Sequence, residues 1–489
     1  MSETTENLSI VVIGASGHLA RTKILPALFA LYCQDFLPKR FRVIGFARTP
    51  LTDAEFRASI AENLTCRYTP QESCEDRMKE FLACCTYLSG QYDSTEDIRA
   101  LVPALRAAQD GAPDNRVFYL AVPPQVFLPV THALGAAGFA APPAAGTWCR
   151  VVIEKPFGHD RTSSDLLTME MSQVFKEEQI YRIDHYLGKE VIQNLLVLRF
   201  ANAIFEPIWN RHYVRSVQIT WKENLTIEGR GGYFDTSGII RDVMQNHLLQ
   251  ILSLIAMEPP ARLDATHIRN AKVNALLCVP PPMLEDMAIG QYAATNRGGV
   301  HIPGYRDDPS VRPDSRTATY AAAALRVVNA RWDGVPFLLR AGKGLDGRVS
   351  EIRMQFRPMP GGMFTTPDDE TNELVIRIQP DEAITFRIWS KVPGLEMDLA
   401  LHDLDFQYKT KFTQLIPDAY EDLLLDILRG EKSLFIREDE LAAAWDVFTP
   451  VLNDIDRRKI EPEPYEFGTH GPAGADRLAK RHGVAWHAG

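Results

Sequence analysis

Two short segments hold more reactive side chains than a folded core requires. Residues 182–189, RIDHYLGK, bring a carboxylate, an imidazole, a phenol and an ammonium into eight residues. In residues 238–250, GIIRDVMQNHLLQ, the helical period predicts a helix whose apolar pattern is interrupted by polar side chains, His247 among them. An imidazole of ordinary pKa can accept a proton near neutral pH, which is the work of a general base. A hydrogen-bonded core histidine is the competing interpretation, because histidine is of intermediate burial.

A turn of small residues follows the first predicted strand. Residues 14–20, GASGHLA, lie between SIVVI and an apolar helical pattern. Small residues let the backbone approach a pyrophosphate, whose charge the amides and dipole of a helix N-terminus stabilise. The second strand ends at Arg48, where a guanidinium favours a ribose 2′-phosphate over the 2′-hydroxyl of NAD. A ligand-free turn and a solvated arginine are the alternatives.

The elements that must position these groups fall into two regions. Up to residue 185, short β-branched runs alternate with longer helical stretches, which is typical of βαβ units and a parallel sheet. The predicted strands are Ser9–Ala15, Arg42–Ala47, Arg116–Val122, Arg150–Glu154 and Tyr181–His185. The third strand leads into apolar backbone at Leu120–Pro124, which is suited to lie along a nicotinamide ring.

The second region has a different pattern. The predicted strands here are SVQITWKE (216–223), PFLLRAGK (336–343), SEIRMQFR (350–357), ELVIRIQP (373–380) and AITFRIWSK (383–391). Several alternate apolar and polar residues, as expected of an antiparallel sheet with one covered face. Helical periods return at 413–430 and 438–455. We therefore expect an α/β N-terminal Rossmann-type dinucleotide-binding domain (1–185) and a larger α+β domain with a mainly antiparallel open sheet (186–489).

Composition excludes several classes of protein. The chain has 489 residues and a net charge of −10, whereas nucleic-acid binding relies on excess basic charge. No apolar run approaches the ~18 residues of a membrane span. The seven cysteines contain no Cys-x-x-Cys pair, so we expect free thiols, no metal centre and a reducing compartment. The polar start, MSETTENLS, does not look like a secretory signal or a transit peptide. These observations predict a cytoplasmic protein.

Six motifs together resemble the glucose-6-phosphate dehydrogenase family. They occur in the family's order and at comparable spacing over roughly residues 8–480. The motifs are 14–20, EKPFG (154–158), RIDHYLGKE (182–190), GRGGYFD (229–235), IRDVMQNHLLQ (240–250) and RWDGVPF (331–337). The resemblance implies oxidation of glucose 6-phosphate at carbon 1 to 6-phosphogluconolactone, with hydride transfer to NADP.

The resemblance also implies roles for residues. His247 matches the base, and Asp184 matches the carboxylate that orients it. The residues implied to bind substrate are Lys155, His185, Tyr186, Lys189, Glu223, Asp242, Lys343 and Arg348. Those implied to bind cofactor are Gly14, Ala15, Ser16, Gly17, Leu19, Lys23, Arg48, Ala121, Pro123 and Lys155. The peptide before Pro156 is implied to be cis. Three residues or runs depart from the family's usual pattern. His18 stands where the family usually has Asp, Arg21-Thr22-Lys23 replaces a more Lys-rich run, and Phe127 stands where many members have Tyr.

Two other functions compete with this one. One is another NADP-dependent sugar dehydrogenase, which the phosphate-binding set His185, Tyr186 and Lys189 opposes. The other is an NADP-sensing protein without turnover, which has no need of a base. The resemblance further implies a homodimer or homotetramer that associates through the sheet domain.

Some family members hold a second, structural NADP beside the sheet. Four arginines here fall at matching positions: Arg340, Arg353, Arg377 and Arg387. However, His470 replaces an arginine and Thr385 an aromatic residue, and the tail lacks a further aromatic segment. We therefore expect one tightly bound NADP per subunit and no strong second site.

Overall fold

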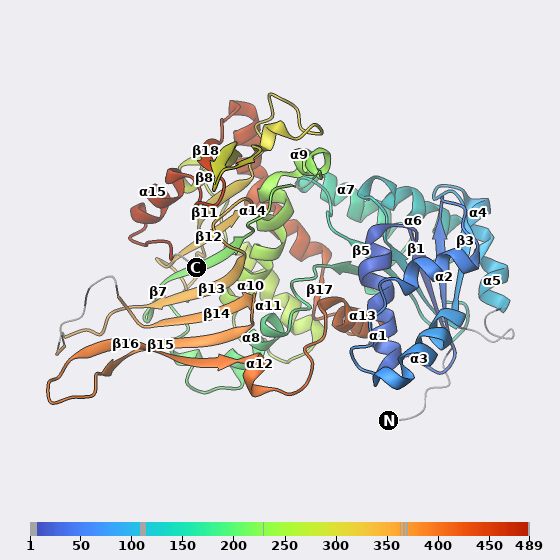
Figure 1. Cartoon of the computed structure of the whole chain (residues 1–489), viewed down its shortest axis with the longest axis horizontal. Helices are drawn as coiled ribbons and strands as arrows, with labels where there is room; N and C mark the ends of the chain where they lie inside the picture. The colour runs from blue at the N-terminus through green and yellow to red at the C-terminus, as the bar shows by residue number, and fades with distance from the viewer. Residues whose placement is uncertain are drawn as a thin grey trace.

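The computed structural model describes residues 7–107, 114–227, 229–361, 363, 364, 367 and 370–487. Residues 1–6, the first part of the polar start, lie outside the described residues. Two sheets form the centres of two units that lie side by side, with helices between them (Figure 1). Among the described residues, no helix has the length and apolar character to cross a bilayer.

The N-terminal unit is built on a seven-stranded sheet in the order β17-β6-β5-β4-β1-β2-β3. Adjacent strands of this sheet are parallel, except that β17 pairs antiparallel with β6. The strands are β1 (Asn7–Ile13), β2 (Phe41–Ala47), β3 (Cys85–Ser89), β4 (Asp114–Leu120), β5 (Cys149–Glu154), β6 (Ile180–Ile183) and β17 (Phe435–Ile436). The order 3-2-1-4-5-6 is that of dinucleotide-binding folds. All five predicted strands are confirmed, with ends that differ by up to two residues, whereas β3 and β17 were not predicted.

Helices cover both faces of this sheet, so every residue of β1 is buried. They are α1 (Leu25–Cys33), α2 (Asp53–Ala61), α3 (Gln71–Ala83), α4 (Thr95–Arg99), α5 (Leu101–Ala107), α6 (Phe127–Ala136) and α7 (Arg161–Ser172). Thr52 and Glu55 form a capping box at the start of α2, and Asp160 and Ser163 form another at α7. Phe127, which stands where many family members have Tyr, is buried in the core.

The expectation that all the thiols are free is wrong. Cys66 and Cys74 form a disulfide with a Cα–Cα distance of 5.8 Å, while Cys33, Cys84, Cys85, Cys149 and Cys278 are free. The start of α3 brings the two half-cystines together from a spacing that no local motif reveals. The argument from free thiols to a reducing compartment therefore loses its basis.

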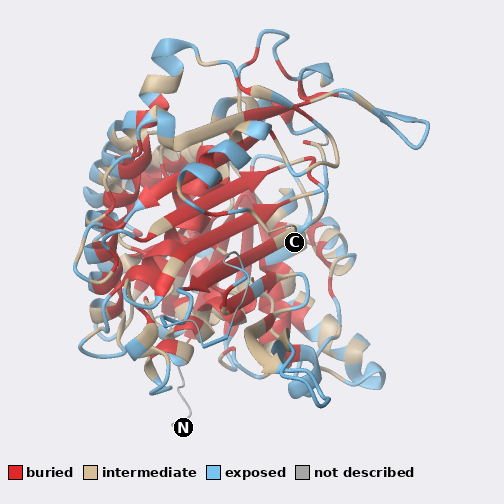
Figure 2. Cartoon of the chain, turned by 90° about the vertical axis from the view of Figure 1, so that its left-hand side faces the viewer, coloured by how far each residue is buried: buried red, intermediate tan, exposed pale blue. Residues whose placement is uncertain are grey.

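The second unit is built on a nine-stranded sheet in the order β16-β15-β14-β13-β7-β12-β11-β8-β18. Only the β7–β12 and β8–β18 pairs are parallel, which confirms a mainly antiparallel sheet. Its strands are β7 (Val214–Lys222), β8 (Met287–Ala293), β11 (Tyr320–Arg326), β12 (Pro336–Gly342), β13 (Val349–Phe356), β14 (Glu373–Gln379), β15 (Ala383–Lys391), β16 (Leu399–Gln407) and β18 (Glu463–Glu466). Figure 2 shows its central strands as buried. A separate ribbon pairs β9 (Thr295–Arg297) with β10 (Val300–Ile302).

Helices form a layer between the two sheets. They are α8 (Glu190–Phe200), α9 (Gly231–Ile239), α10 (Leu249–Ala256), α11 (Ala265–Leu277), α13 (Ala419–Arg429) and α14 (Glu438–Arg458), while α12 (Tyr408–Lys411) and α15 (Ala473–Arg481) lie elsewhere. Three buried tryptophans join this layer to its surroundings. Their indole N–H groups donate to backbone carbonyls: Trp209 to Ile255, Trp332 to Ala256 and Trp445 to Phe157.

The predicted helix at 238–250 is not a continuous α-helix. Gly238 breaks it with φ of 63°, and Ile240–Leu248 forms a π-helix, η5, before α10 begins. In a π-helix the backbone hydrogen bonds join residues that are five positions apart, whereas in an α-helix they join residues that are four apart. Asp242 and His247 are five apart, so this geometry places both on the side that faces the rest of the site.

Candidate active site

A cleft of about 1080 Å³ lies between the two units. Its walls come from the nucleotide turn, the ends of β5 and β6, η5, the ends of β7 and β12, and the residues that precede α13. All eight residues expected to bind substrate line it, together with His247, Leu19 and Lys23. Asp184 lies behind His247, buried. The structure thus brings together side chains from both expected domains.

His247 and Asp184 form a buried pair. His247 Nδ1 lies 2.5 Å from Asp184 Oδ1, and the backbone N–H of Tyr186 donates to the same oxygen at 2.9 Å. Burial would raise the pKa of Asp184, but the charge and hydrogen bond of His247 outweigh it and lower the pKa. Burial also lowers the pKa of His247, against the opposing effect of Asp184. The imidazole is therefore neutral at pH 7, with Nδ1–H held by the carboxylate and the Nε2 lone pair directed away from it.

Lys155 meets His247 and Asp242 from the end of β5. Its Nζ lies 3.0 Å from His247 Nε2 and donates to the carbonyl and Oδ1 of Asp242 at 2.7 and 3.2 Å. Burial opposes the charge, yet Asp242 raises the pKa of Lys155, and Lys155 in turn lowers that of Asp242. The Lys155–Pro156 peptide is cis, as expected. Asp184, His185 and His247 also lie close enough to hold a metal ion, but the ammonium beside Nε2 opposes a cation there.

The RIDHYLGK segment supplies the next wall of the cleft. The Tyr186 ring stacks on that of His247 at 4.4 Å, and its Oη accepts a hydrogen bond from Trp221 at 2.5 Å. Lys189 lies 5.3 Å from the Tyr186 ring. Burial lowers the pKa of His185 well below its usual value, so it is a neutral hydrogen-bond donor. Lys189 supplies the positive charge, although burial lowers its pKa as well.

The sheet domain supplies the opposite wall. Lys343 Nζ pairs with Glu223 Oε2 at 2.7 Å, where the chain leaves β12 and β7. Arg348 lines the cleft a few residues further on. Between these two residues, Asp346 Oδ1 accepts a hydrogen bond from Lys222 Nζ at 3.0 Å, and Asp346 Oδ2 lies 2.9 Å from His470 Nδ1. This contact fixes the loop that carries Lys343 and Arg348.

The nucleotide turn lies at the carboxyl ends of β1, β2 and β4. Gly14 has φ of 93°, and a Cβ placed there would lie 2.3 Å from the Ala121 carbonyl oxygen. Helical backbone begins at His18, after Ala15, Ser16 and Gly17. Ser16 contacts Thr49 at 3.5 Å, which brings the turn next to Arg48, whose guanidinium lies 5.3 Å from the Tyr92 ring. Ala121 and Pro123 follow β4. This cradle, with Arg48 exposed at its rim, fits a dinucleotide that carries a 2′-phosphate.

Several residues of the cleft were missed. Glu154 is buried before Lys155, accepts a 2.6 Å hydrogen bond from Tyr119 and another from Tyr420, and has a pKa raised by burial to about 7. Asp418 pairs with Lys23 at 3.1 Å, and Ser350 lines the cleft beside Tyr186. Glu154 adjoins a recognised motif, but nothing in the helical period at 413–430 distinguishes Asp418 or Tyr420 as cleft residues.

Two family models match the chain. "Glucose-6-phosphate dehydrogenase, NAD binding domain" matches residues 11–194, and "Glucose-6-phosphate dehydrogenase, C-terminal domain" matches residues 196–487. The chain is 53% identical to "Glucose-6-phosphate 1-dehydrogenase 1, chloroplastic" of Arabidopsis thaliana, over 98% of this chain and 83% of the relative. A solved structure of "Glucose-6-phosphate dehydrogenase in complex with its substrate glucose-6-phosphate" is 40% identical, covers all of both chains and has a TM-score of 0.91.

The predicted cytoplasmic location is contradicted by these relatives. Those at 51–53% identity are named chloroplastic, whereas an Arabidopsis relative named cytoplasmic shares 45% over 99% of this chain and 94% of its own length. The sequence argument failed because a polar start and sparse cysteines do not distinguish one internal compartment from another. The two family models and the full-length similarity establish that the chain belongs to the glucose-6-phosphate dehydrogenase family.

Proposed function

We propose that the chain oxidises glucose 6-phosphate at carbon 1 to 6-phosphoglucono-1,5-lactone. One observation carries the proposal: a neutral, carboxylate-held imidazole faces a cleft that has a dinucleotide turn at one end and phosphate-binding side chains at the other. NADP supplies the hydride acceptor when bound. The protein's own part is to bind, orient and deprotonate the sugar.

His247 is the base in this proposal. Its Nε2 takes the proton of the carbon 1 hydroxyl as the hydride leaves, and Asp184 stabilises the imidazolium that forms. Lys155 Nζ lies 3.0 Å from Nε2. It must move onto the substrate and cofactor before the carbon 1 hydroxyl can reach the Nε2 lone pair. Asp242 and Glu223 then accept hydrogen bonds from sugar hydroxyls.

The substrate phosphate is held by donors of two kinds. Lys189 and Arg348 supply charge, and His185 and Tyr186 supply neutral hydrogen bonds. Lys343 completes the set from the sheet domain. At the cofactor end, Lys23 and the amides of the turn meet the pyrophosphate, and Arg48 meets the 2′-phosphate.

We also infer that subunits associate through the sheet domain, as a dimer or a tetramer. β16 is an edge strand, and the β15–β16 region exposes Leu395, Met397 and Leu404. Light scattering coupled to gel filtration measures the mass; a monomer at micromolar concentration would contradict the inference. The boundary between domains at residue 185 stays a prediction.

A matrix of turnover assays tests the function. Glucose 6-phosphate and glucose are each supplied with NADP and with NAD, and reduced cofactor is followed by absorbance. We expect strong turnover only with the phosphorylated sugar, and a preference for NADP. Equal rates with glucose would favour another sugar dehydrogenase, and cofactor binding without turnover would favour a sensing protein.

A further inference from the structure

The outer face of the large sheet is charged and yet buried. Its side chains come from alternate positions of β7, β12, β13 and β14, whereas Trp221 and Ser350, on the other face, line the substrate cleft. The residues of the outer face are between 2% and 8% exposed: Gln218, Thr220, Lys222, Arg340, Glu351, Arg353, Gln355 and Glu373. Buried charges persist in proteins only when they are paired and covered. Some part of the protein must therefore cover and pair these charged side chains.

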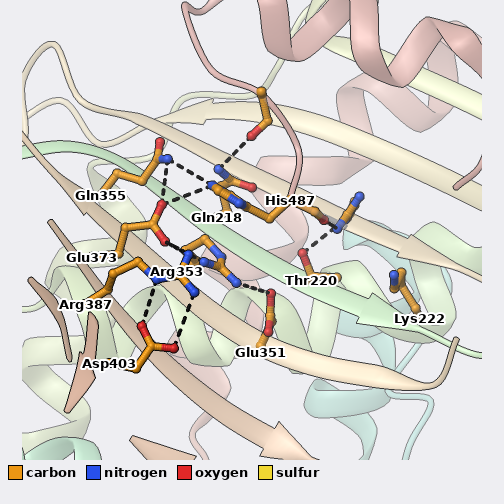
Figure 3. Close-up of polar contacts among 12 residues, drawn as sticks. Gln218, Thr220, Lys222, Glu351, Arg353, Gln355, Glu373, Arg387, Asp403 and His487 are labelled. Atoms are coloured by element: carbon orange, nitrogen blue, oxygen red, sulfur yellow. Dashed lines mark hydrogen bonds and ion pairs between the residues drawn. The ribbon is translucent and has the colours of Figure 1, made fainter. Parts of the chain in front are cut away.

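The cover is the chain's own C-terminal segment, residues 483–487. Gln218 Nε2 donates to the Ala485 carbonyl at 3.1 Å, and Arg340 donates to the His487 carbonyl at 2.7 Å. The His487 ring lies 3.2 Å from Gln355 Nε2 and 3.0 Å from Glu373 Oε1 (Figure 3). The segment is thus bound by both its backbone and its side chains.

Arg340 connects this segment to the strands. Its guanidinium lies 4.7 Å from the Trp486 ring, and its Nε donates to Thr220 Oγ1 at 3.1 Å. Two of its three partners, the Trp486 ring and the His487 carbonyl, come from the C-terminal segment. Without the segment, Arg340 would be uncovered and would keep only Thr220 of these three partners; water would enter the face, and the strands that the segment holds would be free to shift.

Such a shift reaches the substrate cleft within three residues. Arg340 pairs with Thr220 in the β12–β7 ladder, and Gly342 pairs with Lys222 at its end. The next residue of each strand enters the cleft: Lys343 after β12 and Glu223 after β7, joined at 2.7 Å. The two strands carry the sugar contacts as one rigid unit.

We propose that the C-terminal segment is a positioning element for the sugar side of the site. Docked on β7, β12 and β13, it sets the strand ends that present Glu223 and Lys343 to glucose 6-phosphate. The proposal rests on the proposed function for the identity of the substrate. It assigns no contact between the segment and the cofactor, which lies at the other end of the cleft.

The test compares the full chain with a chain that ends at Gly483. We expect the KM for glucose 6-phosphate to rise about fivefold to tenfold, the effect of misplacing one charge-assisted contact, with kcat and the KM for NADP within about twofold. The synthetic peptide VAWHAG, residues 484–489, should restore the KM, and the same peptide with W486A and H487A should not. A chain that ends at His487 is the matched control and should behave as the full chain does.

Point variants cover the case in which the shortened chain does not fold. In the full chain, Trp486→Leu should raise the same KM, and Trp486→Phe should restore it, because the aromatic ring over Arg340 returns. Unchanged constants in the shortened chain and in Trp486→Leu, or equal rises for both substrates, would overturn the proposal. If the full chain does not turn over glucose 6-phosphate, the proposed function fails; binding of labelled VAWHAG to the shortened chain then decides docking, and its absence overturns the proposal.

Discussion

At the scale of single residues, the site depends on one neutral imidazole between charges of opposite sign. Asp184 holds Nδ1, and Lys155 lies beside Nε2. Burial and Lys155 lower the pKa of His247, while Asp184 raises it. The base is therefore ready at neutral pH, and the acid limb of the kcat/KM profile, which reports the free enzyme, should lie below the ordinary histidine pKa of about 6.5.

Replacing His247 with Asn removes the base and keeps a polar side chain that can form hydrogen bonds. We expect kcat to fall by about 10² to 10⁴, while the Kd for glucose 6-phosphate stays within about threefold, because a general base acts in the transition state. Steady-state kinetics and calorimetric titration measure the two quantities. A loss confined to substrate affinity would refute the role of His247.

Glu154 should make stability depend on pH. Burial raises its pKa from 4.5 to about 7, so the folded protein holds one more proton than the unfolded chain between these values. Stability contributed by this group is present below pH 4.5 and is lost as pH rises through 7. Glu154→Gln removes the charge, and we expect it to be more stable than the unmutated protein at pH 8 by about 1–3 kcal/mol, but not at pH 4.5.

Thermal unfolding at the two pH values measures this difference. The exposed residue Glu396 provides the control, since Glu396→Gln should leave the pH dependence as it is. If the stability of Glu154→Gln and that of the unmutated protein change with pH in parallel, the pKa of the Glu154 carboxyl is not raised in the folded protein, and the prediction is wrong.

At the scale of elements, strand ends place most of the cofactor and sugar contacts. Arg48 follows β2 by one residue and lies over the Tyr92 ring, which orients the guanidinium before any ligand arrives. Arg48→Ala should weaken NADP binding about 10- to 100-fold and NAD binding far less, since only NADP carries the phosphate. Arg42→Ala, at the opposite end of β2, should change neither. Equal losses for the two cofactors would mean that Arg48 acts on the fold.

The start of α13 is placed by a close approach to Gly188. A Cβ at this position would lie 2.6 Å from the Ala419 carbonyl oxygen. Gly188→Ala should therefore destabilise the protein by about 1–3 kcal/mol and raise KM values, because it displaces the wall that carries Asp418 and Tyr420. A Cβ at Gly347 would meet nothing within 4 Å, so Gly347→Ala is the matched control for unfolding measurements. Equal stability of the two variants would show that α13 adjusts freely.

Elements with a strong local pattern could be predicted, and those that depend on distant partners could not. The five N-terminal strands and the strands at 336–391 have clear β-branched or alternating runs. Phe435–Ile436 is two residues long and becomes a strand only because β6 presents a free edge. The π-helix at Ile240–Leu248 is likewise invisible, since its apolar spacing also fits an α-helix.

Residues of the site divide in the same way. The motif residues Asp184, His247 and Lys155 were predicted and meet in the structure. Tyr420 and Asp418 come from a distant part of the chain, and the docking of α13 brings them to the cleft. Tertiary packing decides such contacts, and no local pattern encodes them.

At the scale of the whole molecule, three of the four arginines expected at a second nucleotide site are already engaged. Arg353 pairs with Glu373, Arg387 with Asp403 at 2.9 Å, and Arg340 with the C-terminal segment. We expect titration of cofactor-free protein to give one tight NADP site per subunit. That site should be weakened about 10- to 100-fold in Arg48→Ala; a second tight site that survives this variant would contradict the expectation.

Trp221 gives the molecule a built-in optical reporter. Of the seven tryptophans, Trp209, Trp332 and Trp445 are fixed in the core, and their emission should stay constant. Trp221 instead lines the cleft, with its N–H on Tyr186 and the Lys343 ammonium 5.3 Å from its ring. An arriving sugar phosphate draws that charge away from the indole, so the fluorescence spectrum should shift as the cleft fills. Substrate occupancy can thus be followed without label, and Trp221→Phe should abolish the signal.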